Sequence, residues 1–199
     1  MNRRQLLSLP LLITNTSTVR IPVLRVNNIH SRCSQQQVTG FQNQVWNEAV
    51  QTFEKNGISL DIVDREGEVG KYPSDRPRFV GLDRTRVNVV VTDRVPMYWD
   101  HGRELGGIST IYEGCHLSVA SMQLAHGFRI PFFSVNTLVH ELLHLFLQDV
   151  FTPSGGLWNT HSHESRVDWY ATRMWLFRDG AAVRESARQY VRRLPYLSN

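Results

Sequence analysis

The residues of this chain best suited to chemistry are His140, Glu141 and His144, which form the motif His-Glu-Leu-Leu-His inside an apolar stretch. Two histidines four positions apart lie on one face of a helix and can reach the same metal ion. Glu141 lies beside that face, close enough to take a proton from a water molecule at the ion. Burying an unpaired carboxylate among leucine side chains would cost several kcal/mol. A metal beside a solvent-filled cleft removes that cost, so the motif predicts a catalytic Zn²⁺ site.

A catalytic zinc ion needs a third protein ligand and keeps its fourth position for water. Glu164 follows His144 by twenty residues, and Asp168 lies four residues further on. This spacing resembles the glutamate-zincin pattern of thermolysin-like peptidases. The resemblance implies that His140, His144 and Glu164 are the zinc ligands, that Glu141 is the general base, and that Asp168 supports a zinc histidine. The last role agrees with chemistry, because ligating histidines commonly donate their other N–H to a carboxylate.

Two histidines close to Glu164 keep other ligand sets open. The chain departs from the thermolysin-like pattern at His163, where that pattern usually has an asparagine. A second candidate for the third ligand is a histidine, His161 or His163. The developing oxyanion also needs a donor, which thermolysin-like enzymes supply from histidine or tyrosine. We expect His161 or His163 in that catalytic role, with Tyr112 and Tyr170 also available.

The chain before the motif is similar to metzincins and other small zincins. A helix, a buried strand at 87–91 and a strand with Gly106-Gly107 are expected before the zinc-binding helix. In such enzymes the glycine-bearing edge strand lines the cleft and binds extended substrate through main-chain hydrogen bonds. The metzincin motif itself is incomplete, because Leu147 and Val150 occupy the positions of its glycine and last histidine.

Two further interpretations use the same helix differently. Glu113-Gly114-Cys115-His116-Leu117-Ser118 resembles the EGCLS motif of peptide deformylases, interrupted by His116, which implies a metal amidase with Cys115 as a ligand. The other interpretation is a zinc-stabilised binding module without catalysis. Glu141 argues against such a module, since a structural zinc needs no base and is more often closed by four protein ligands.

Hydrophobic spacing predicts the elements that would position these residues. We expect strands at 19–26, 58–63, 87–91 and 106–112, a short strand and turn within 116–131, and helices at 39–55, 132–150, 162–178 and 181–193. Ser134 or Asn136 could cap the helix that carries the motif. This order predicts an α+β fold with a small mixed sheet, a central HExxH helix and a helical C-terminal part. We expect one zincin-like domain over 19–199, with a cleft between the sheet and the helices from about residue 157.

Composition and charge indicate which classes of binding partner to expect. The net charge is +4 and the pI about 9.4, but the arginines are dispersed, which favours a solvated basic surface over nucleic-acid binding. No apolar run approaches the roughly 20 residues of a membrane-spanning helix. We therefore expect no nucleic-acid partner and no integral membrane segment. The resemblance to zincin peptidases implies a peptide or protein substrate.

The first 18 residues bear on location. Asn2-Arg3-Arg4-Gln5-Leu6-Leu7 resembles a twin-arginine export signal, although no Ala-x-Ala cleavage site follows. The resemblance implies a periplasmic or secreted protein; the alternative is a cytoplasmic protein with a basic amphipathic terminus. Cys33 and Cys115 would be able to pair in an exported protein and would remain thiols otherwise.

Overall fold

The computed structural model describes residues 17–28, 35–66, 79, 81–92, 106–112, 114–121, 129–130, 133–134, 136–147, 171 and 180–194. The predicted export segment falls almost wholly on residues 1–16, outside this set. So does the predicted helix at 162–178, except for Ala171, which is helical and buried. No helix among the described residues is long and apolar enough to cross a membrane.

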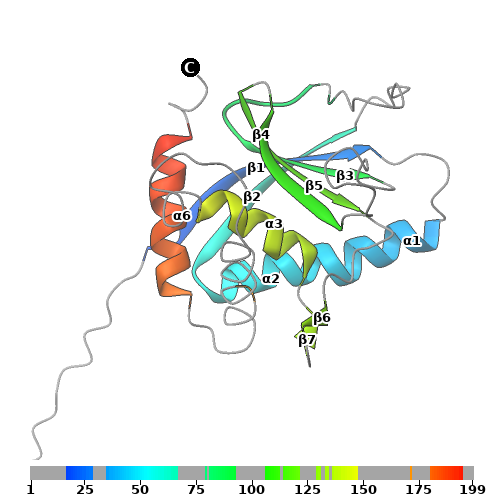
Figure 1. Ribbon diagram of the computed structural model, residues 1–199, viewed down its shortest axis with the longest axis horizontal. Coiled ribbons are helices and arrows are strands. Elements are labelled where there is room, and N and C mark those ends of the chain that lie inside the picture. The colour runs from blue at the N-terminus through cyan, green and yellow to red at the C-terminus, as the bar shows by residue number, and fades with distance from the viewer. Residues whose placement is uncertain are drawn as a thin grey trace, which may run out of the picture.

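A five-stranded sheet forms the centre of the described structure (Figure 1). Its strands are β1 (Val19–Asn28), β2 (Ile58–Glu66), β3 (Val87–Thr92), β4 (Gly107–Tyr112) and β5 (Cys115–Ser121). Their order is β2-β1-β3-β5-β4, in which the first four are mutually parallel and β4 runs antiparallel to β5 at one edge. All the predicted strands are confirmed. The valine-rich β3 is the middle strand and is buried along its whole length, as β-branched residues favour.

The first helical region is a continuous run before β2. It comprises α1 (Gln35–Gly40), the π-helical turn η1 (Phe41–Trp46) and α2 (Asn47–Lys55). It ends at Asn56 and Gly57, where Gly57 adopts a φ of 74° that suits glycine. The helix predicted at 39–55 is thus confirmed, and so is the last helix, α6 (Ala181–Arg193).

The helix that carries the motif is shorter than predicted. α3 spans Thr137–Phe146, whereas the prediction began at residue 132. Phe133–Ser134 instead form β7, which pairs with β6 (Arg129–Ile130). The apolar pattern misplaced the start because it does not distinguish a short strand from a first helical turn. The cap decides the boundary: the Asn136 side chain accepts a hydrogen bond from the Val139 N–H at 3.2 Å.

The described helices cover one face of the sheet (Figure 1). The main core joins β1, β2 and β3 to the apolar sides of η1, α2, α3 and α6. A smaller cluster on the opposite face combines Leu24, Val26, Val90, Leu117 and Val119 with the partly buried Phe79 and Leu82. The expected combination of helices with a small mixed sheet is therefore confirmed, and four of the five strands are parallel.

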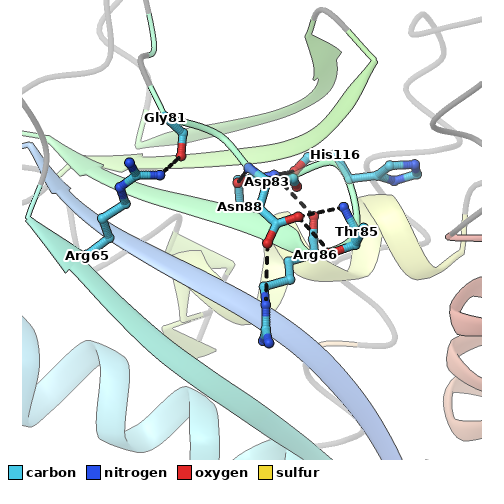
Figure 2. A network of polar contacts seen from close by, with 7 residues as sticks. All are labelled: Arg65, Gly81, Asp83, Thr85, Arg86, Asn88 and His116. Atoms are coloured by element: carbon cyan, nitrogen blue, oxygen red, sulfur yellow. Dashed lines mark hydrogen bonds and ion pairs between the residues drawn. The ribbon is translucent and has the colours of Figure 1, made fainter.

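Asn88 ties the turn before β3 to the neighbouring strand β5 (Figure 2). Its side chain is fully buried on the face opposite the helices. The amide group accepts from the Asp83 N–H at 2.7 Å and donates to the carbonyls of Asp83, Arg86 and His116 at 2.8–3.1 Å. A buried amide satisfied in this way is not an energetic liability. It fixes the position of β5, whose other face meets α3.

The same turn is closed by Asp83 itself (Figure 2). The Thr85 hydroxyl and N–H both donate to one oxygen of the Asp83 carboxylate, and Arg86 lies 3.5 Å from the other. The side-chain hydrogen bond from Thr85 is the main cause that lowers the pKa of Asp83. The Arg65 guanidinium donates to the Gly81 carbonyl at 2.7 Å and links this turn to β2.

Candidate metal centre

Helix α3 is fixed in place before it reaches the motif. Asn136 caps the helix with its side-chain oxygen, and its side-chain nitrogen donates to the Val45 carbonyl of η1 at 2.7 Å. All ten residues of α3 are buried between the sheet and the other helices. The position of the motif along the helix axis is therefore set by packing on several sides and by one polar anchor.

The two motif histidines point their ring nitrogens at each other. His140 Nε2 and His144 Nε2 lie 2.9 Å apart, and the two rings are nearly perpendicular. Two nitrogens bound to one tetrahedral zinc at about 2.0–2.1 Å would be separated by about 3.3 Å. The observed separation is close to this value. In the metal-free protein, one ring can instead donate its N–H to the other.

Glu141 leaves the same helix toward the edge strand. Its side chain lies so close to Gly107 of β4 that a Cβ there would come within 2.6 Å of its Cγ and Oε1. Any residue larger than glycine would therefore displace either the glutamate or the strand. His140, Glu141 and His144 are 3%, 4% and 5% exposed, so the carboxylate is as deeply placed as the histidines.

Two serines, Ser109 and Ser118, lie beside Glu141. Ser109 Oγ lies 2.7 Å from the Glu141 carbonyl oxygen, 3.0 Å from its Oε2 and 2.7 Å from Ser118 Oγ. Ser109 and Ser118 are direct cross-strand partners on β4 and β5. Sequence reasoning assigned them no role, although their inward position in two predicted strands was a usable signal.

Another buried polar pair lies further along β5. His116 Nδ1 and the Tyr190 hydroxyl of α6 are 2.6 Å apart, and their rings meet edge to face. His116 Nε2 is buried and has no hydrogen-bond partner among the described residues. Burial lowers the pKa of His116 to about 4 and raises the pKa of Tyr190. His116 is therefore neutral in the folded protein at neutral pH.

This shift predicts acid sensitivity of the fold. An unfolded histidine has a pKa of about 6.5, so between pH 6.5 and pH 4 the unfolded chain binds the extra proton. The contribution of His116 to stability is fully present above about pH 6.5 and is lost as the pH falls toward 4. Urea unfolding should show wild type losing about 2–3 kcal/mol more than His116→Gln between about pH 7.5 and pH 4.5. Identical pH dependence in the two proteins would contradict this account.

The other predicted site residues fall outside the described set. These are Glu164, His161, His163, Asp168, Tyr170 and Cys33. Within the described ranges, no three His, Cys, Asp or Glu side chains form a group that could hold a metal ion. Cys115 is a buried cysteine on β5 and does not form such a group with His140 and His144. The described part of the site thus offers two nitrogen donors and an adjacent carboxylate.

Comparison with known proteins adds no further assignment. No protein-family model, curated protein or solved structure matches the chain.

Proposed function

We propose that this protein is a zinc-dependent metallopeptidase of the zincin type. The observation that carries the proposal is the pair of converging Nε2 atoms of His140 and His144, with the side chain of the neighbouring Glu141 against the edge strand β4. Imidazole nitrogen is a preferred ligand of zinc, and two donors four residues apart on one helix suit a single ion. The donor chemistry of the described residues therefore fits the metal that the motif predicts.

The position of β4 supports the substrate side of the proposal. Among the described strands β4 pairs only with β5, so no described strand occupies its outer edge. An extended peptide could bind there through main-chain hydrogen bonds, as expected from the similarity to small zincins. Ile111 on β4 is one of two large apolar side chains that are exposed in the described part of the chain, and it offers a contact for a substrate side chain.

The chemistry follows from the residues of the motif. A zinc ion held by the two histidines would polarise the scissile carbonyl and lower the pKa of a water molecule. Glu141 takes a proton from the water as the water oxygen attacks the carbonyl carbon of the substrate. It then delivers that proton to the amide nitrogen, and the C–N bond breaks to release the amine. His161 or His163 is the proposed donor to the oxyanion.

The proposed third ligand is Glu164, with Asp168 supporting one of the zinc histidines. Glu164 is preferred because its spacing from His144 follows the thermolysin-like pattern. His161 and His163 are the alternatives, and replacing each of the three residues separately with alanine identifies the ligand through the loss of zinc.

Metal analysis of the purified protein tests the proposal directly. We expect about one zinc per chain, and expect chelation to abolish cleavage of casein or of a peptide library until zinc is restored. A formyl-methionyl peptide should be tested as a substrate beside these. Release of formate from it would indicate a deformylase-like amidase, whereas cleavage of peptide bonds indicates a peptidase. A stably folded, metal-free protein that takes up no added zinc would contradict the proposal.

A further inference from the structure

We propose that Ser109 is a positioning residue that holds the Glu141 carboxylate against β4, with Ser118 directing its hydroxyl. This inference rests on the proposed function for its catalytic meaning. It starts from the two contacts of Ser109 Oγ with Glu141, at 2.7 Å to the backbone carbonyl and 3.0 Å to Oε2. A strand residue thus contacts both the main chain and the side chain of the predicted general base.

The direction of these hydrogen bonds follows from a count of protons. A serine hydroxyl has one proton to donate and two lone pairs that accept. The Glu141 backbone carbonyl can only accept, so the Ser109 proton goes to it at 2.7 Å and can be shared with Oε2 at 3.0 Å. The 2.7 Å contact between the two serines must then be donated by Ser118 to Ser109. Ser118 therefore fixes the rotation of the Ser109 hydroxyl, and Ser109 orients Glu141.

The strand contributes a second constraint on the carboxylate. Gly107 and Ser109 are two residues apart, so both face α3. The absence of a side chain at Gly107 leaves room for Glu141 Cγ and Oε1, and the Ser109 hydroxyl contacts Oε2. Together these two residues of β4 hold the carboxylate along the strand. Proton transfer from the attacking water depends on the position of this carboxylate.

The expected effect is confined to turnover. Ser109→Ala should keep its zinc and its KM but lower kcat about 10–100-fold, the range typical for outer partners of a metal site. Ser109→Thr keeps a hydroxyl and should recover most of the lost turnover. Ser186→Ala is the matched control, since Ser186 is a buried serine on α6 and has no place in the site.

A second measurement tests the contact without using activity. In the metal-free protein, Ser109→Ala should lower Tm by about 2–8 °C, and by clearly less when Glu141 is already alanine. Additive Tm shifts would overturn the inference whatever the activity. Wild-type turnover in zinc-loaded Ser109→Ala would overturn it as well. A third outcome is that the wild-type protein neither binds zinc nor cleaves peptides, while Ser109→Ala still lowers Tm less when Glu141 is already alanine. That outcome would overturn the proposed function and with it the catalytic role of Ser109.

Discussion

Replacing Glu141 with glutamine is expected to lower kcat about 10²–10⁴-fold while zinc remains bound, the range typical for loss of a general base. Glutamine has nearly the same shape, so it fits the space beside Gly107 and can still accept a hydrogen bond from Ser109. It cannot take a proton from water at neutral pH. Because the lost interaction belongs to the transition state, KM should change little. Steady-state kinetics on a cleaved peptide and zinc analysis of the same preparation measure the two effects.

A matched control for this variant is Glu54→Gln on α2. Glu54 is an exposed glutamate far from the motif in sequence, and it undergoes the same chemical change. Its activity should equal that of wild type. Unchanged cleavage of casein by Glu141→Gln would rule out the peptidase mechanism, whereas retained zinc with lost cleavage would distinguish a catalytic ion from a structural one.

Replacing His144 with alanine is expected to abolish stoichiometric zinc binding. Loss of a residue that only supports a ligand costs about 10–100-fold in metal affinity, so loss of a ligand should weaken binding by more than about 100-fold. The Nε2 atom of His144 lies 2.9 Å from that of His140, and removing the His144 ring leaves a single histidine nitrogen on α3 to bind zinc. Added zinc should therefore raise the Tm of wild type by mass action and leave that of His144→Ala unchanged. Thermal unfolding over a zinc titration measures the difference.

The control for this variant is His116→Gln. His116 is also a buried histidine that contacts α6, but its hydrogen bond goes to Tyr190, and it is paired with no other histidine among the described residues. It should retain full zinc content. One tightly bound zinc per chain in His144→Ala, or an equal loss of zinc in both variants, would contradict the assignment of the pair.

The sequence was most informative where one local pattern dominates. The run of valines in β3 and the amphipathic spacing of α6 each depend on residues a few positions apart, and both elements lie where predicted. The motif histidines are four residues apart on α3, so their convergence also follows from helix geometry alone. The start of α3 was predicted less well, because an apolar residue such as Phe133 suits a strand and a helix equally.

Contacts between distant parts of the chain could not be predicted in the same way. Ser109 and Glu141 are 32 residues apart, and His116 and Tyr190 are 74 apart. Each depends on the order of strands in the sheet and on the angle at which a helix crosses it. Spacing within a segment does not contain that information. The predicted strand at 106–112 was nevertheless right, but the close approach of Gly107 to Glu141 depends on how α3 packs against β4, which the spacing of the strand does not give.

The two bonds of Asn136 have a consequence for how the motif faces its surroundings. An α-helix turns by about 100° for each residue, so a slide of one residue along its axis rotates every side chain by more than a quarter turn. A helix displaced in that way would turn the Glu141 side chain away from Gly107 and Ser109 of the edge strand. By joining the start of α3 to the Val45 carbonyl, Asn136 favours the helix register in which Glu141 meets β4 and the two histidine rings meet each other.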